Sequence, residues 1–276
     1  MIIHILILVL AIVAAPASAG AHTEAQVRIA ELTLALADHP GDPSLWVERA
    51  SEYLEIGDPA AALRDLDRAS ALAAYRADVP LARGATLLAL GRAAEAEQQL
   101  TLAIIRDPAS PVAYALRARA QQALGRPLEA AAGFGRSVEL SPLATPDQFL
   151  EWSRALAAPK AGRIEDALAV LDRGLAAIGE SMALVEEAVR LECARGAWDE
   201  ALARIERHPA AWGSSAAGRA RRGDVLRAAG RELEAQAEYS AALSEIEARG
   251  RPGSVTPLET RLHAALRQGP PTQDTP

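Results

Sequence analysis

The chain has 276 residues, of which 50% are hydrophobic, 4% are aromatic and 24% are charged. Apolar content made mostly of Ala and Leu favours closely packed helices over β-strands, which prefer branched and aromatic side chains. The net charge of −7, with no basic stripe along any expected helix, argues against nucleic acid as a partner.

The first 21 residues have the pattern of a secretory signal peptide. Residues 1–21 contain no Lys, Arg, Asp or Glu, and a nearly unbroken apolar run over 2–13 precedes a stretch of small residues. We expect cleavage after Ala19, or as a second choice after Ala21. The rival interpretation is an uncleaved anchor, but the run is shorter than the ~20 apolar residues that span a bilayer. The chain is expected to be exported, and to be periplasmic or secreted.

Beyond this segment a glycine recurs at almost constant spacing, and an alanine follows each glycine five residues later. Successive glycines are 34, 34, 37, 34 and 34 residues apart, which indicates one supersecondary unit repeated six times. Each unit is expected to be a helix ended by its glycine, a short turn and a second helix. The pairs are Gly57/Ala62, Gly91/Ala96, Gly125/Ala130, Gly162/Ala167, Gly196/Ala201 and Gly230/Ala235.

Other positions repeat with the glycines. A large side chain stands four residues after each alanine, and small residues such as Ala50, Gly84, Ala118 and Gly223 stand seven before the glycine. Small residues at fixed points let helices approach closely, while large ones fill the gaps between layers. The large residues are Leu66, Leu100, Phe134, Leu171, Ile205 and Tyr239.

This pattern resembles the tetratricopeptide repeat family, whose unit is 34 residues of helix-turn-helix. The resemblance runs from residue 43 to about 245. It implies an all-α fold, a right-handed α-solenoid of about six units with a capping helix at each end. The matching residues are Trp46, Ala50, Tyr53, Gly57, Ala62, Leu66 and Ala69 in the first unit, and Tyr114, Ala118, Gly125, Ala130, Phe134, Ser137 and Pro142 in the third.

The ends of the repeat array fit the same architecture, because a solenoid needs terminal caps over its core. We expect a signal peptide at 1–21, a capping half-repeat at 22–42, six repeats at 43–249, a C-terminal capping helix at 250–268 and a disordered tail at 269–276. The half-repeat is expected to contain a helix over 25–37.

Two segments depart from the repeat. The fourth unit has three extra residues, which we place in a lengthened turn over 158–161 before Gly162. The segment 207–215 is expected to end a second helix early. Its Trp212 either folds onto the stack or is presented to a ligand at a local bend.

Arginines recur eight residues before four of the glycines, at Arg49, Arg83, Arg117 and Arg222. They could form a ladder for anionic groups. The alternative is that each packs its stem and pairs with a carboxylate on an adjacent helix, such as Asp65.

No motif of catalytic or metal-binding specificity is present. The five histidines are scattered without ligand spacing, and no phosphate loop or nucleophile elbow occurs. The single cysteine, Cys193, cannot form an intramolecular disulfide and is expected to be a small buried residue. We therefore expect no enzyme activity, no cofactor and no metal.

The resemblance implies that the first helices line a concave groove that binds a peptide or a helix. The family's carboxylate clamp, made of Lys and Asn, has no counterpart, because the chain has one lysine and no asparagine. We assign the groove positions of the family to the first helices of this chain and add Trp212. The candidate partner-binding residues are then Ser51, Leu54, Glu55, Ala85, Leu88, Arg119, Gln122, Arg154, Trp212 and Arg227.

The expected function is that of an exported, non-catalytic scaffold for another protein or peptide, in a bacterial envelope assembly or beside a secreted enzyme. No stable membrane span is expected after cleavage. The abundance of Ala, Arg, Leu and Gly suggests a bacterium with a GC-rich genome. The alternatives are a homo-oligomeric structural protein that stacks through an exposed terminal layer, and the repeat part of an enzyme or sensor.

Overall fold

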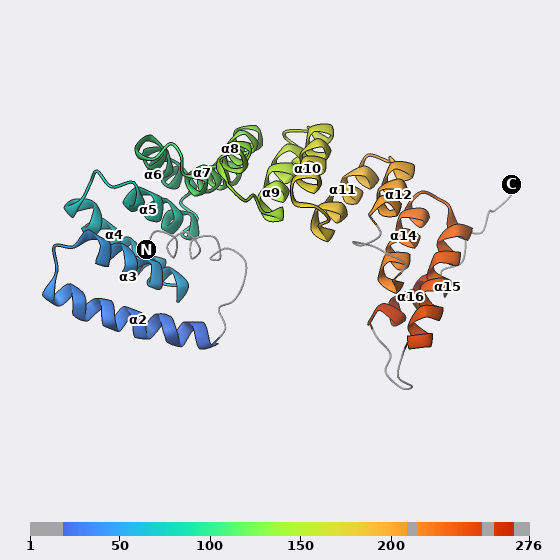
Figure 1. The fold of residues 1–276 in the computed structure, drawn as a ribbon, viewed down its shortest axis with the longest axis horizontal. Coiled ribbons are helices and arrows are strands. Elements are labelled where there is room, and N and C mark those ends of the chain that lie inside the picture. Colours follow the sequence, from blue (N-terminus) through green and yellow to red (C-terminus); the bar gives the residue numbers. More distant parts are fainter. Residues whose placement is uncertain (1–18, 209–214, 250–256, 268–276) are drawn as a thin grey trace. The chain divides into compact units, whose positions relative to one another are not determined.

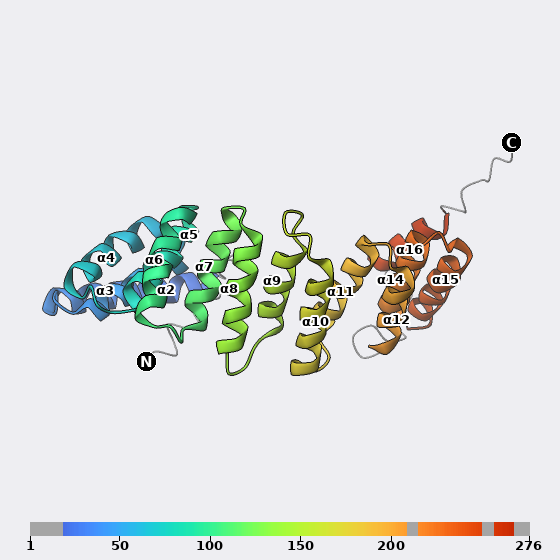
Figure 2. The ribbon, with the colours of Figure 1, turned by 90° about the horizontal axis from the view of Figure 1, so that it is seen from above.

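The structure is a computed structural model that describes residues 19–208, 215–249 and 257–267 (Figures 1 and 2). These residues form fourteen α-helices and no strand, which confirms the expected all-α fold. The helices are α2 (Ala19–Asp38), α3 (Pro43–Glu55), α4 (Pro59–Leu72), α5 (Asp78–Ala89), α6 (Ala93–Arg106), α7 (Pro111–Ala123), α8 (Pro127–Leu140), α9 (Pro146–Ala157), α10 (Ile164–Ile178), α11 (Met182–Ala194), α12 (Trp198–Arg207), α14 (Ala216–Ala228), α15 (Glu232–Arg249) and α16 (Pro257–Arg267).

The chain divides into two compact units. Unit 1 comprises residues up to Ala144 together with Arg154–Gly162, and unit 2 comprises Thr145–Ser153 and everything from Arg163 onward. Within each unit, helices that follow one another in the sequence pack as pairs, α3 with α4, α5 with α6 and α7 with α8 in unit 1. In unit 2, α11 packs with α12 and α14 with α15. Each pair is one sequence repeat, so the repeat architecture is confirmed.

Prolines and short polar side chains define where several helices begin. Proline occupies the first turn of α3, α4, α7 and α8, where its missing N–H is not needed. The Asp58 carboxylate accepts a hydrogen bond from the Ala61 amide at 2.9 Å. The Ser110 hydroxyl accepts one from the Ala113 amide at 3.3 Å. Such caps satisfy amides that have no partner inside the helix.

The recurring glycines end the first helix of each repeat. All six have a positive φ, between +64° and +78°, which side chains other than glycine rarely adopt. At Gly57 this conformation lets the Asp58 amide donate back to the Tyr53 carbonyl at 2.8 Å. The same backward bond follows Gly91, Gly125, Gly196 and Gly230.

The turn before Gly162 is longer than the turns at the other five glycines. Helix α9 ends at Ala157, and the Gly162 amide donates to the Ala158 carbonyl at 2.9 Å. The three extra residues therefore lie between α9 and α10, which confirms the lengthened turn.

Small residues lie directly against large ones sixteen positions later. A Cβ added to Gly84 would stand 2.4 Å from Leu100 Cγ, and one added to Gly223 would stand 2.5 Å from Tyr239 Cε1. Both large side chains are buried, as are Leu66, Phe134 and Leu171. In these repeats the core has a small residue on the first helix under a large one on the second, as expected; the fifth repeat has Val189 at the corresponding position.

The N-terminal helix differs from the sequence expectation in detail, whereas the C-terminal helix was expected. Helix α2 begins at Ala19, six residues before the expected start, and ends at Asp38. At the other end α16 packs against α15 and buries Leu262 completely. The signal-like residues 1–18, the linker 250–256, the tail from 268 and Trp212 lie outside the described residues, so the domain boundaries stay predictions.

Candidate binding site

A hollow of about 240 Å³ opens in unit 2 among α11, α14 and α16. Figure 1 shows α14 and α16 side by side within this unit. The Ser215 hydroxyl caps α14 by accepting from the Gly218 amide at 3.2 Å, so the first turn of α14 forms one wall. That wall is open because Ala217 and Gly218 are small. The lining residues are Met182, Glu186, Ser215, Ala217, Gly218, Arg221, Leu258 and Arg261.

The size of the hollow limits what it can hold. Pockets for drug-sized molecules and cofactors measure roughly 300–1,000 Å³. At about 240 Å³ this hollow suits one side chain of a partner better than a whole cofactor. Met182, 60% exposed, and the half-buried Leu258 supply its apolar surface.

Charged groups surround this apolar surface. Arg221 Nη2 donates to Glu186 Oε1 at 3.1 Å, linking α14 to α11. Arg261 Nη2 donates to Asp224 Oδ2 at 2.6 Å, linking α16 to α14. The Tyr239 hydroxyl donates to the other Asp224 oxygen at 3.1 Å. Two guanidinium groups are thus held at the hollow by carboxylates on neighbouring helices.

Tyr239 stays an uncharged hydrogen-bond donor in this arrangement. Burial, and then the negative charge of Asp224, raise the pKa of Tyr239 to about 12. Asp224 therefore receives one bond from a neutral phenol and one from a guanidinium, which orients Arg261 at the wall.

Arg227 positions the C-terminal helix. Its Nη2 donates to the Ala265 carbonyl at 2.8 Å, and its guanidinium lies 4.7 Å from the centre of the Tyr239 ring. It also contacts Glu232 at 3.3 Å. Arg227 was a candidate partner-binding residue, but in the structure it joins α14, α15 and α16.

Among the projected residues that the structure describes, none lines the hollow. Ser51 and Leu54 are only 8% and 7% exposed, and the Ser51 hydroxyl donates to the Val47 carbonyl at 3.1 Å. Both are largely covered by their own unit, and their part in partner binding stays a prediction. The remaining described positions are half-buried or exposed: Glu55, Ala85, Leu88 and Arg119 are half-buried, and Gln122 and Arg154 are exposed.

Sequence reasoning missed the hollow for a positional reason. The projected residues came mostly from the last two turns of the first helices. Met182, Glu186 and Ala217 instead stand fourteen, ten and thirteen residues before the repeat glycine, in the first turns. The contribution of α16 depends on where that helix docks, which no repeat position encodes.

The aligned arginines serve the repeats themselves. Arg49 donates from Nε and Nη2 to Asp65 at 2.7 and 2.8 Å. Arg83 pairs with Asp67, and Arg222 contacts Glu206 at 2.8 Å. Arg117 instead stacks 5.5 Å from the centre of the Tyr114 ring. The pairing interpretation is therefore confirmed for three of the four.

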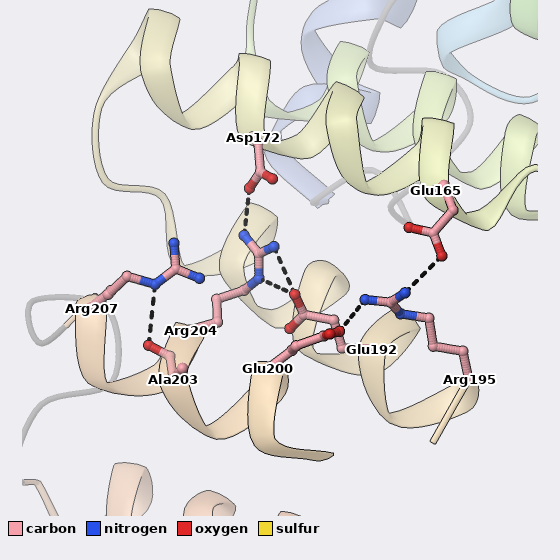
Figure 3. A network of polar contacts seen from close by, with 8 residues as sticks. All are labelled: Glu165, Asp172, Glu192, Arg195, Glu200, Ala203, Arg204 and Arg207. Atoms are coloured by element: carbon pink, nitrogen blue, oxygen red, sulfur yellow. Dashed lines mark hydrogen bonds and ion pairs between the residues drawn. The ribbon is translucent and has the colours of Figure 1, made fainter. Parts of the chain in front are cut away.

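A buried ionic network joins α10, α11 and α12 in unit 2 (Figure 3). Arg204 and Glu192 have side chains only 5% and 4% exposed and lie 2.7 Å apart, and Arg204 Nη1 also donates to Asp172 at 2.5 Å. Burial alone would lower the pKa of Arg204, but the bonds to Glu192 and Asp172 outweigh burial and raise it. The network holds three helices together.

Reactive chemistry is not apparent in the described parts of the chain. Cys193 is half-buried, and burial raises the pKa of its thiol, so the neutral thiol predominates near neutral pH. In those same ranges no three His, Cys, Asp or Glu side chains gather as metal ligands. None of the helices that the structure describes has both the length and the apolar content to span a membrane.

Comparisons with known proteins agree with the repeat fold. Residues 158–264 match the family model of the tetratricopeptide repeat-like domain. No curated protein sequence matches the chain. The C-terminal part of a repeat-containing protein from Cytophaga hutchinsonii has a similar structure, with a TM-score of 0.63 at 17% identity over 86% of this chain and 93% of that one.

Two further solved structures are similar over most of this chain. A tetratricopeptide repeat protein from Parabacteroides merdae gives a TM-score of 0.53 at 15% identity, over 90% of this chain and 98% of that one. A chain of the APC/C hetero-tetramer Cut9–Hcn1 gives 0.53 at 13% identity, over 90% of this chain and 46% of that one. At these identities the likeness shows the fold, which is that of tetratricopeptide repeat proteins.

Proposed function

We propose that the protein is an exported, non-catalytic scaffold that binds a segment of another protein in the hollow of unit 2. The observation that carries this proposal is the hollow itself. Helices α11, α14 and α16 together present an apolar surface, with Arg221 and Arg261 at its walls. Its volume suits one side chain, so a partner would insert an anchor residue there and lay its backbone across the neighbouring helices.

The fold supports the same proposal. A stack of repeats gives an extended surface without a separate catalytic domain, and the similar Cut9–Hcn1 structure is a hetero-tetramer. The signal-like sequence of residues 1–21 supports export to a bacterial envelope, where the partner would be an envelope assembly or a secreted enzyme.

Filling the hollow tests the proposal. Ala217 is exposed and lines the hollow, so Ala217→Trp would occupy it at little cost to the fold. Ala228→Trp, at an exposed position on the same helix outside the lining, is the matched control. Each mature protein is immobilised and exposed to an envelope extract, and the retained proteins are identified by mass spectrometry.

We expect at least one protein to be retained by the wild type and by Ala228→Trp but lost with Ala217→Trp. Retention of the same proteins by all three, or retention of none, contradicts binding in the hollow. Concentration-dependent self-association that Ala217→Trp abolishes would instead support the homo-oligomeric alternative.

A further inference from the structure

Helix α2 has two apolar faces, and its own unit uses one of them. Ala25, Leu32 and Leu36 are 2–5% exposed and form the buried face. On the opposite side Val27 is 55% exposed and Leu34 is 72% exposed. Figure 1 shows α2 as the first helix of unit 1, with α3 beside it. We call the exposed positions the outer stripe: Thr23, Val27, Ala30, Leu34 and Ala37.

The spacing of the outer stripe distinguishes it from scattered surface leucines, which are common and need no explanation. Its positions follow one another at intervals of four, three, four and three residues. That spacing is typical of the seam of a coiled coil, and Val27 and Leu34 are its large residues here. Ala30 lies at the centre of the stripe, where its small side chain lets a second helix approach closely.

Acidic side chains lie along only one flank of the outer stripe. Glu24, Glu31 and Asp38 follow one flank of α2, and Glu48 and Glu52 of α3 lie next to it. Arg28 contacts this group, with Nη1 at 3.1 Å from Glu31 and Nη2 at 3.7 Å from Glu48. Burial and then the charge of Glu55 raise the pKa of Glu52, with Glu24 and Glu48 adding to the effect.

The other flank carries no carboxylate. It consists of His22, Gln26 and Thr33, and the Thr33 hydroxyl accepts a hydrogen bond from Arg49 at 3.0 Å. The charge of Arg49 is matched by Asp65. A helix lying along the stripe would therefore meet negative charge on one side only.

We propose that the outer stripe of α2 binds an amphipathic helix of another protein, one that carries Lys or Arg along a single flank. The apolar seam supplies the contact area and the acidic flank selects the charge and orientation of the partner. A second copy of α2 would bring another set of the same carboxylates to the seam, so charge repulsion disfavours it. Both expected cleavage sites leave the stripe intact, and the surface is independent of the hollow in unit 2.

The test uses the mature chain and two labelled synthetic helices of about three heptads. Both peptides have the same apolar seam, but one has Lys and the other Glu along one flank. Binding is followed by fluorescence anisotropy for the wild type, Leu34→Glu and the matched control Leu233→Glu. Leu233 is a leucine of α15 that is 78% exposed, comparable to Leu34. Circular dichroism confirms that all three proteins are folded.

We expect the Lys peptide to bind the wild type and Leu233→Glu equally, and to bind Leu34→Glu at least about tenfold more weakly. The added carboxylate would strengthen purely electrostatic attraction, so a weaker complex identifies the apolar seam. Equal or tighter binding to Leu34→Glu, equal binding of the Glu peptide, or no binding overturns the proposal. So does self-association of the wild type that Leu34→Glu abolishes, because a second copy would then cover the stripe.

Discussion

Gly57 and Gly84 are both glycines for physical reasons, but the reasons differ. Gly57 has φ at +78° and nothing within 4 Å of an added Cβ, so its role is conformational. Gly84 lies inside a helix, where Leu100 fills the space that a side chain would need. The recurring glycines therefore mark turns of the backbone. The small residues seven positions before them mark places where two helices pack closely.

This difference predicts the effect of Gly84→Ala. Alanine favours a helix over glycine by about 1 kcal/mol. Its Cβ would stand 2.4 Å from Leu100 Cγ, however, and overpacking costs about 1–3 kcal/mol. We expect a net loss of roughly 1 kcal/mol in the free energy of unfolding, measured by urea denaturation. Gly41→Ala, where nothing lies within 4 Å, is the control and should be close to neutral. Equal effects at both sites would refute the packing argument.

Glu52 gives a pH-dependent prediction. Its pKa is raised above 4.5 in the folded protein, first by burial and then by Glu55. Its contribution to stability is therefore complete below the unfolded pKa and is lost as pH rises through the folded pKa. Glu52→Gln carries no charge at any pH, so at pH 7 we expect a melting temperature about 1 °C above that of the wild type.

The advantage of Glu52→Gln should disappear below about pH 4, where the wild-type carboxyl is protonated in both states. Thermal melts at several pH values measure this difference. Glu247→Gln, at an exposed position of α15, is the control and should show no such trend. A gain for Glu52→Gln that is constant with pH would contradict a charge effect.

At the scale of helices, ion pairs join neighbouring elements in two opposite arrangements. In the first repeat the arginine is on the first helix and the acid on the second, as Arg49 on α3 and Asp65 on α4. In the fifth repeat Arg204 is on the second helix, α12, and Glu192 on the first, α11. The second-helix position is the same in both repeats, eight residues after the glycine, but its partner on the first helix moves from eight to four residues before the glycine.

For the buried pair Arg204–Glu192 we expect that the effects of substituting the two residues on stability are strongly coupled. Arg204→Met would leave Glu192 buried without its guanidinium, which costs about 3–5 kcal/mol of unfolding free energy. Glu192→Leu added to Arg204→Met removes the stranded charge, and most of the stability should return. Urea denaturation of the wild type, both single variants and the double variant measures the coupling. A double variant as unstable as Arg204→Met would show that the charge is not the cause.

Because α16 both packs against α15 and lines the hollow, we expect a change in its packing to affect binding in the hollow. Leu262 is fully buried, so Leu262→Ala removes contacts worth about 2–5 kcal/mol. Because α16 contributes Leu258 and Arg261 to the hollow, its loosening should also weaken binding of the partner there.

Hydrogen exchange measures this effect of Leu262→Ala. Faster exchange is expected in α16, with little change in α5 and α6 of unit 1. Unchanged exchange in α16 would contradict the role of Leu262 as its anchor. Leu266→Ala, at a half-buried position of the same helix, should show a smaller effect.

At the scale of the whole chain, export is a prediction from the sequence. Residues 1–21 have the apolar run and small-residue site of a signal peptide. We expect the protein taken from its natural cell envelope to begin at Gly20 or His22, as N-terminal sequencing would show. Detection of the intact Met1 terminus on all of the protein would favour the uncleaved anchor.

Most of the fold could be predicted from the sequence, because the repeat makes each residue's role recognisable six times over. The turns at Gly57 and Gly162, the layer made by Leu100 and Phe134, and the pairing of Arg49 were all anticipated. The candidate site was not. Its residues come from the first turns of α11 and α14 and from α16, which follows a linker outside the repeats.

What the sequence determined by itself is therefore the local and periodic part of the protein. Helix length, glycine conformation and the alternation of small and large residues depend on neighbours along the chain or sixteen positions away. The tertiary structure alone decided that Ser51 and Leu54 are buried, that Arg227 contacts Ala265, and that α2 exposes Leu34. These outcomes depend on which face of each helix is covered by the neighbouring helices. A repeat pattern describes the contacts that the repeats share, but not the contacts particular to one repeat or to the first and last helices.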